Sequence, residues 1–267
     1  MKVVKSNYQN YFEIEMEKKE NLSIAKDIKI GKTSFYQVKY KDNEYIMDLI
    51  IDIGSEASLK LYGKEFLIPN LYEKILYELS KDYNTLKLTI FNEDSGLSEL
   101  IKSKSNVIEI KELEKSTFKE YIYLIDLTNI DDSNISGDFK IEKYSYEKYI
   151  KYQEDTIKNR LEYNNLKLGL DNFYEIYDEE SNLITSFIVQ RNYSKNHLQL
   201  NERLYFVPNL LKNIFKELKK DYEHVSLVTF SDSHDTINQI KSVAKNYEEV
   251  TIDPLNKIGL TTITINL

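Results

Sequence analysis

The chain contains an internal repeat. Residues 68–83 read IPNLYEKILYELSKDY and residues 207–222 read VPNLLKNIFKELKKDY, so nine of sixteen positions are identical without a gap. Two of the three prolines, Pro69 and Pro208, occupy equivalent places. A repeat at this spacing in 267 residues predicts two related units, each of ordinary domain size.

The same register extends along most of the chain, at offsets of 138 and 139 residues. The equivalent pairs include Tyr8 and Tyr146, Tyr11 and Tyr149, Gly31 and Gly169, Phe35 and Phe173, Leu88 and Leu227, and Phe91 and Phe230. The residues between the copies are polar and have the composition of a linker. We therefore predict a first domain over residues 1–127, a linker over 128–138 and a second domain over 139–267.

Composition excludes several classes of protein. The chain has no Cys, which removes disulfides and Cys-ligated metals, and three His make a His-based metal site unexpected. A net charge of −8 argues against binding to nucleic acid or to an anionic membrane. The polar N-terminus is not a signal peptide, and the apolar runs are shorter than a membrane helix requires. We expect a cytoplasmic, bacterial-type protein without a bound metal.

Each copy shows the same order of predicted elements: a strand, a helical region, three strands, a helix, a strand, a short helix and two strands. In the second copy Ser145 is the predicted N-cap of a helix that runs to Asn159. The third strand of the second copy is predicted to end on 204–207, before Pro208, and that of the first copy to end at Ile68. The predicted closing strands, 120–127 and 260–267, are free to pair between copies or between chains, so a homo-oligomer is expected to be accessible.

The central helix of each copy has one apolar face. Leu71, Ile75 and Leu79 recur every four residues in the first copy, and Leu210, Ile214 and Leu218 recur in the second. This spacing predicts a helix that packs against a sheet.

This element order resembles the GNAT fold, the family of CoA-dependent N-acyltransferases, and the resemblance covers both copies. It implies an α+β fold with a mixed sheet, here as a tandem duplication. It also implies that the strands on either side of the central helix separate to admit the pantetheine arm of an acyl-CoA. The cofactor pyrophosphate would then lie at the N-terminus of that helix, where free amides and the helix dipole attract anions.

Neither copy has the glycine-rich pyrophosphate motif of the family. In the first copy, Asn70 and Glu73 have the spacing of a capping box, which would place a carboxylate where a phosphate should bind. In the second copy, Asn209 is again the predicted cap, but Lys212 stands at the position of Glu73. The resemblance therefore implies that acetyl-CoA or another acyl-CoA binds in the second copy. The residues that it places at this site are Tyr205, Phe206, Val207, Asn209, Leu210, Lys212 and Ser233.

The resemblance also calls for a base that deprotonates an amine, and the carboxylates near the end of the third strand are Glu65 and Glu202. Two functions follow. The first is a divergent N-acyltransferase that acts on an unidentified amine. The alternative is a non-catalytic module that binds a small ligand or a protein partner. A gap between strands that is open to an extended ligand favours the enzyme, whereas a gap filled by Tyr205 or Phe230 favours the module.

Overall fold

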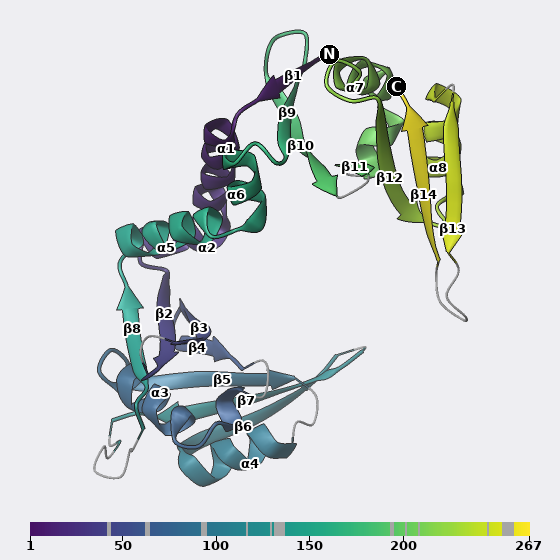
Figure 1. Ribbon diagram of the computed structural model, residues 1–267. Coiled ribbons are helices and arrows are strands. Elements are labelled where there is room, and N and C mark those ends of the chain that lie inside the picture. Colours follow the sequence, from purple (N-terminus) through teal and green to yellow (C-terminus); the bar gives the residue numbers. More distant parts are fainter. Residues whose placement is uncertain are drawn as a thin grey trace. The chain divides into compact units, whose positions relative to one another are not determined.

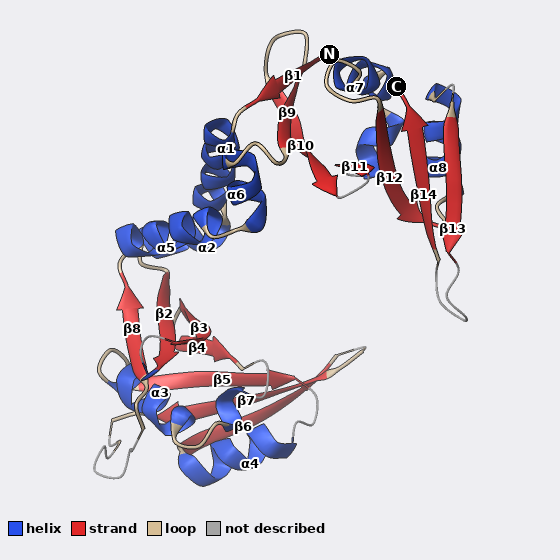
Figure 2. Ribbon diagram, in the orientation of Figure 1, coloured by secondary structure: helices blue, strands red, loops and turns tan. Residues whose placement is uncertain are grey.

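The computed structural model describes residues 1–41, 44–61, 65–91, 95–115, 117–128, 130, 137–192, 195–200, 202–207, 209–244, 246–252 and 259–267. The protein is a mixed α+β fold with two seven-stranded sheets (Figures 1 and 2), as the sequence predicts. The elements of the first half are β1 (Lys2–Ser6), α1 (Tyr8–Asn21), α2 (Ser23–Lys29), β2 (Thr33–Tyr40), β3 (Glu44–Ile53), β4 (Ala57–Lys60), the 3-10 helix η2 (Glu65–Leu67), α3 (Leu71–Ser80), β5 (Thr85–Phe91), α4 (Ser95–Lys104), β6 (Asn106–Glu114) and β7 (Lys119–Asp126).

The second half has the same element order. Its elements are β8 (Lys140–Tyr144), α5 (Tyr146–Lys158), α6 (Leu161–Lys167), β9 (Asn172–Tyr177), β10 (Leu183–Asn192), β11 (Lys195–Gln199), the 3-10 helix η3 (Glu202–Phe206), α7 (Leu210–Leu218), β12 (His224–Phe230), α8 (His234–Val243), β13 (Tyr247–Ile252) and β14 (Leu260–Asn266). Ser145 caps α5 as predicted, since its Oγ accepts a hydrogen bond from the Lys148 amide at 3.2 Å. Helix α6 falls in a stretch for which the sequence predicts no element.

The predicted apolar faces of the central helices are confirmed. Leu71, Ile75 and Leu79 of α3 are at most 1% exposed, and the matching leucines and isoleucine of α7 are fully buried. Each helix packs on its sheet in a separate hydrophobic core, one per unit. These cores account for the repeated sequence stripe, because it is the surface that each helix buries.

Each sheet is completed by a strand from the other sequence copy. β1 pairs antiparallel with β9 (from Lys2 opposite Tyr177 to Ser6 opposite Phe173), and β8 pairs with β2. The strand orders are β1-β9-β10-β11-β12-β14-β13 and β8-β2-β3-β4-β5-β7-β6. Figure 1 shows the purple β1 beside the green β9, and the teal β8 beside the dark β2.

The compact units therefore differ from the predicted domain ranges 1–127 and 139–267. Unit 1 comprises residues 1–17 and 154–267, and unit 2 comprises residues 18–153. The chain passes from one unit to the other within α1 and returns within α5. The physical reason is the backbone pairing of β1 and β8, which places each N-terminal arm with the sheet that it extends.

Aromatic side chains fix the exchanged arms. Tyr11 of α1 packs edge-on against Phe173 of β9 at 5.4 Å between ring centroids. The equivalent Tyr149 of α5 packs against Phe35 of β2 at 5.0 Å. Both tyrosines are less than 10% exposed, so the repeated Tyr residues serve the sheet of the opposite copy.

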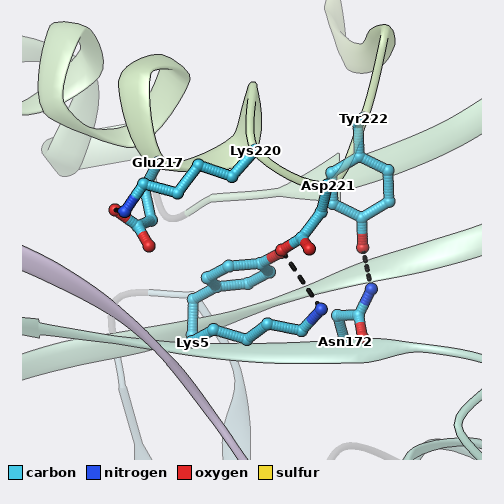
Figure 3. Close-up of polar contacts among 7 residues, drawn as sticks. Lys5, Asn172, Glu217, Lys220, Asp221 and Tyr222 are labelled. Carbon is cyan, nitrogen blue, oxygen red and sulfur yellow. Dashed lines mark hydrogen bonds and ion pairs between the residues drawn. The ribbon is translucent and has the colours of Figure 1, made fainter.

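A repeated polar cluster also holds each exchanged strand. In unit 1, Tyr174 donates a hydrogen bond to Asp221 at 2.8 Å, and Lys5 of β1 forms an ion pair with the same carboxylate at 3.1 Å (Figure 3). In unit 2, Asp82 accepts a hydrogen bond from Tyr36 at 2.5 Å and pairs with Lys143 of β8 at 3.1 Å. We call these two sets the Tyr–Asp–Lys clusters. Burial acts to raise the pKa of each Asp, but the hydrogen bonds from Tyr and Lys outweigh it and hold the pKa below its usual value.

The predicted closing strands are not sheet edges. β7 lies between β5 and β6, and β14 lies between β12 and β13. The exposed edges at this end of the sheets are β6 and β13, because the last strand of each copy inserts beside the strand that follows the central helix. The prediction that 120–127 and 260–267 are edge strands is therefore wrong.

The strand exchange predicts that the two sequence copies stay associated after the chain is cut. A protease recognition sequence placed between Ile130 and Gly137 would yield one fragment that carries β1 and one that carries β8. The fragments should elute together in native size-exclusion chromatography, since each contributes a strand and a helix to the other's sheet. Elution at the separate sizes of the two fragments would contradict the exchange, and separation in urea is the control for complete cleavage.

The Tyr–Asp–Lys clusters predict equal losses in the two units. Tyr36→Phe and Tyr174→Phe each remove a hydrogen bond to an ionised carboxylate and should lower the free energy of unfolding by about 1.5 kcal/mol in urea titrations. Tyr247→Phe, at an exposed ring, is the matched control and should change it by less than about 0.5 kcal/mol. If only one of the two substitutions lowers the free energy of unfolding, the two clusters do not contribute equally to stability.

Candidate functional site

The parallel strands that flank the central helix share different numbers of described ladder pairs in the two units. In unit 2 the strands β4 and β5 pair at four positions, from Ala57 opposite Leu86 to Lys60 opposite Thr89. The Leu61 amide continues this contact with a hydrogen bond to the Thr89 carbonyl at 2.9 Å. In unit 1, among the described residues, β11 and β12 pair at a single position, His197 opposite Ser226, although the two strands lie side by side as β4 and β5 do.

β11 is paired more extensively with its other neighbour, β10. These two strands pair at five positions, from Lys195 opposite Asn192 to Gln199 opposite Ile188. On the β12 side, the side-chain amide of Asn196 donates to the His224 carbonyl at 3.1 Å.

The segments that precede the central helices are not strands. The predicted strand 204–207 is the 3-10 helix η3, and the predicted strand ending at Ile68 is the 3-10 helix η2. β4 and β11 end several residues before these segments. A short 3-10 helix therefore connects each of the two strands to the central helix that follows it. The apolar runs there are core contacts: Tyr205 is 3% exposed and packs in the core of unit 1, together with the partly buried Val207.

The outcome for the predicted gap-filling side chains is mixed. Of the two side chains predicted to fill a closed gap, Tyr205 is 3% exposed and Phe230 is 52% exposed. Phe206 is 53% exposed. Leu210 is fully buried under α7. Of the predicted cofactor residues, Tyr205 and Leu210 thus belong to the core, and Phe206, Asn209 and Lys212 are exposed at the surface.

Asn70 and Asn209 do not cap their helices with their side chains, which corrects the prediction. Both adopt a left-handed backbone, with φ of 66° and 60°, and neither makes a side-chain capping hydrogen bond. The Leu71 amide bonds to the Ile68 carbonyl at 3.1 Å, which closes a type II turn with Pro69 and Asn70 at its centre. The Leu210 amide bonds to the Val207 carbonyl at 3.2 Å in the same way, although Pro208 lies outside the described residues. Asn tolerates this conformation better than most residues, which explains its repeat.

The helix N-termini differ in charge as the sequence predicts. In α3, Glu73 of the first turn forms an ion pair with Lys104 at 2.9 Å. The first turn of α7 has no acidic residue, and it carries Lys212 at the matching position. Asn213, on the same turn, donates to the Met1 carbonyl at 3.2 Å. An anion at the α7 N-terminus would therefore meet amides and a lysine rather than a carboxylate.

The assignment of Glu65 and Glu202 as bases stays a prediction. Glu65 is an exposed residue at the start of η2. Glu202 begins η3, but its side chain lies outside the described residues. Ser233 occupies the N-cap position of α8 without a side-chain capping bond.

His197 is a functional candidate that the sequence interpretation missed. It lies half-buried on β11, opposite Ser226. Burial lowers the pKa of its imidazole, against a smaller opposing effect of a hydrogen bond to the Ser226 backbone. A neutral imidazole at neutral pH can accept a proton. Residues 196–200, Asn-His-Leu-Gln-Leu, alternate between polar and apolar as a half-buried strand does. This pattern could have placed His197 on a strand from the sequence alone.

A second group of polar residues lies in unit 2, on the sheet face away from α3. Asp48 of β3 stands opposite Gln37 of β2. Its carboxylate accepts hydrogen bonds from the Gln37 amide at 3.5 Å and from the Tyr152 hydroxyl at 3.3 Å. Burial raises the pKa of Asp48, and the hydrogen bonds from Gln37, Tyr152 and Tyr45 only partly offset it.

A pocket of about 300 Å³ opens beside Asp48, where β4 ends and leaves β3 uncovered. Its lining also includes Ile50, Asp52, Lys60 and Phe66. Within the described ranges, no group of three or more His, Asp or Glu is arranged to hold a metal ion. None of the described helices is long and apolar enough to cross a membrane.

Comparison with known proteins gives three partial structural alignments. A spermidine N-acetyltransferase mutant from Vibrio cholerae is 11% identical, with 47% of this chain and 78% of that chain covered and a TM-score of 0.31. An acetyltransferase structure from Agrobacterium tumefaciens is 16% identical, with 43% and 92% covered and a TM-score of 0.27. No family model and no curated protein match the sequence. TM-scores this low carry no assignment of the fold, so the GNAT resemblance stays a prediction from the element order.

The environment of Asp48 predicts a stabilising substitution. Because the folded-state pKa lies above the unfolded one, the ionised carboxylate disfavours folding at pH values above that folded pKa. Asp48→Asn should therefore raise the thermal midpoint at about pH 8, and the gain should shrink toward about pH 4 as the wild-type carboxyl becomes neutral. Asp52→Asn, at an exposed position of the same strand, is the control and should show no such gain. A lower midpoint for Asp48→Asn at pH 8 would show that its hydrogen bonds outweigh its desolvation.

Proposed function

We propose that the protein is an acyl-CoA-dependent N-acyltransferase whose cofactor site lies in unit 1, between β11 and β12. The observation that carries the proposal is the short ladder between these two strands beside the start of α7, where one ladder pair is described. The equivalent strands of unit 2 share four ladder pairs. We therefore assign no cofactor site to unit 2.

The residues at the N-terminus of α7 fit an anionic group. The Asn209 side chain does not cap the helix, and its first turn carries Lys212 and no carboxylate. These features favour the binding of a pyrophosphate by amides, helix dipole and a lysine. Where β11 and β12 share no ladder pair, backbone groups of β12 would pair with the extended arm of the cofactor.

Bound acyl-CoA would supply a thioester-activated acyl group. In the proposed reaction His197 accepts the proton that the acceptor amine loses as its nitrogen forms the amide bond, and a proton is returned to the departing sulfur from solvent. His197 suits this role because its lowered pKa keeps it neutral at neutral pH. Glu202 remains the second proposed base and Glu65 belongs to unit 2. The acceptor is proposed to be an amine of unidentified structure.

The alternative is a non-catalytic module that binds a ligand. It is favoured by the Pro–Asn turn before each central helix, which stands where the family has glycines that admit the pyrophosphate. In that case β11 and β12 of unit 1 bind no CoA, and the pocket beside Asp48 in unit 2 is the remaining candidate for a ligand site.

Titration calorimetry with acetyl-CoA and CoA tests the proposal. We expect wild-type protein to bind both, and Lys212→Glu to weaken binding by roughly tenfold because it reverses the charge at the α7 N-terminus. Lys216→Glu makes the same charge change one turn further along the exposed face of α7 and is the matched control. Absence of heat and of thermal stabilisation with millimolar ligand would reject the enzyme in its CoA form. Equal weakening by both variants would place the cofactor elsewhere.

A further inference from the structure

Strand β6 forms a long, exposed edge of the sheet in unit 2. It pairs with β7 on one side, and in the described part of the chain it has no neighbouring strand on the other. Its large apolar side chains are exposed: Ile108 at 57%, Ile110 at 49% and Leu113 at 41%. An edge strand of this kind is a template for pairing with another strand, so natural sheets usually shorten, cover or charge it.

The backbone groups of alternate residues of β6 point away from β7. The Lys115 amide donates to the Phe118 carbonyl at 2.9 Å across the hairpin turn, so these two residues form a hydrogen-bonded pair. Hydrogen-bonded pairs alternate along an antiparallel ladder, and the register is regular from residue 109 to residue 114. The amide and carbonyl of Ile110, and those of the residue two positions further along, therefore face outward.

The charges of this regular segment favour one way of pairing β6 with the same strand of a second molecule. A two-fold axis sets one residue opposite itself, and an axis at Ile110 sets Glu109 opposite Lys111 of the partner subunit, twice. An axis at any other position from 109 to 114 sets two charges of the same sign opposite each other. Opposite charges at facing positions stabilise a sheet and like charges destabilise it, so the axis at Ile110 is the favoured one.

The side chains near this axis are already arranged for such a contact. Glu109 and Lys111 lie on the same face of β6, where they form an ion pair at 3.1 Å and are 49% and 59% exposed. A second molecule would add the same pair in reverse order, which gives four charges of alternating sign. Glu112 is paired with Lys119 of β7 at 2.7 Å. On the other face of the strand, the two exposed Ile110 side chains would meet at the axis.

The corresponding edge of unit 1 does not offer this match. β13 has six residues against nine in β6, and its sequence, Tyr-Glu-Glu-Val-Thr-Ile, contains two adjacent carboxylates and no basic residue. When β13 pairs with itself, no positive charge of the strand stands opposite either glutamate. The self-complementary edge is therefore a feature of unit 2 and is not required by the fold that the two units share.

We infer that the protein forms a two-fold symmetric dimer in which the β6 strands of two molecules pair antiparallel about Ile110. This pairing joins two seven-stranded sheets into one continuous sheet and satisfies the outward backbone groups of β6. The contact uses one short segment from each molecule, so we expect a dissociation constant on the order of 10 µM. The dimer does not depend on CoA binding in unit 1, so the two proposals can fail separately.

Sedimentation velocity over a concentration series around this value tests the inference on the full chain. Wild-type protein should pass from monomer to dimer. Glu109→Lys and Lys111→Glu each set like charges opposite one another, and each should weaken the dimer by about tenfold or more. An equimolar mixture of these two variants should dimerise again, because every facing pair in the mixed dimer has opposite signs. Glu248→Lys, the same kind of charge change on the exposed edge β13, is the control and should dimerise as wild type does.

Two results would overturn the inference. Wild-type protein that stays monomeric well above this concentration would show that the charges of β6 prevent pairing rather than direct it. Dimers that survive in both single variants, or that only Glu248→Lys weakens, would place the contact at another surface. Recovery of the dimer in the mixture shows in addition that both variants are folded.

Discussion

The structure depends on backbone pairing between strands that lie more than 100 residues apart in the sequence. β1 completes the sheet that contains β9, and β8 completes the sheet that contains β2. Each pairing is reinforced by an aromatic contact on the following helix and by a Tyr–Asp–Lys cluster. Without the exchanged strands, each sheet would expose the edge of its second strand and the underside of its aromatic cluster, so the two units are formed jointly by the two copies.

Duplication has left the two units with one fold and different surfaces. The cores are nearly equivalent, because the helix faces that pack on the sheets carry the same apolar positions. The differences concern how β4 and β11 pair with their neighbours. Among the described residues β11 pairs with β10 at five positions and with β12 at one, whereas β4 pairs with β3 at three positions and with β5 at four. The same short strand is therefore paired differently in the two units.

The two units also differ in the charge of the groups beside these strands. In unit 1 the first turn of α7 carries Lys212 and no acidic residue, and burial lowers the pKa of His197 on β11. In unit 2 Glu73 stands in the first turn of α3, and burial raises the pKa of Asp48 on β3. The N-terminus of the central helix therefore suits an anion better in unit 1 than in unit 2.

The sequence by itself determined the repeat, the element order, the buried face of each central helix and the charge difference between Glu73 and Lys212. These features are local or periodic, so they can be deduced from residue spacing alone. The sheets that β1 and β8 join are known only from the tertiary structure. Both copies have the same order of elements, so the sequence allows either strand to pair with either sheet. The tertiary structure also decided the left-handed Asn70 and Asn209, the 3-10 helices before α3 and α7, and the meeting of Asp48 with Tyr152. These depend on turn geometry and on contacts between distant residues, which hydrophobic periodicity does not encode.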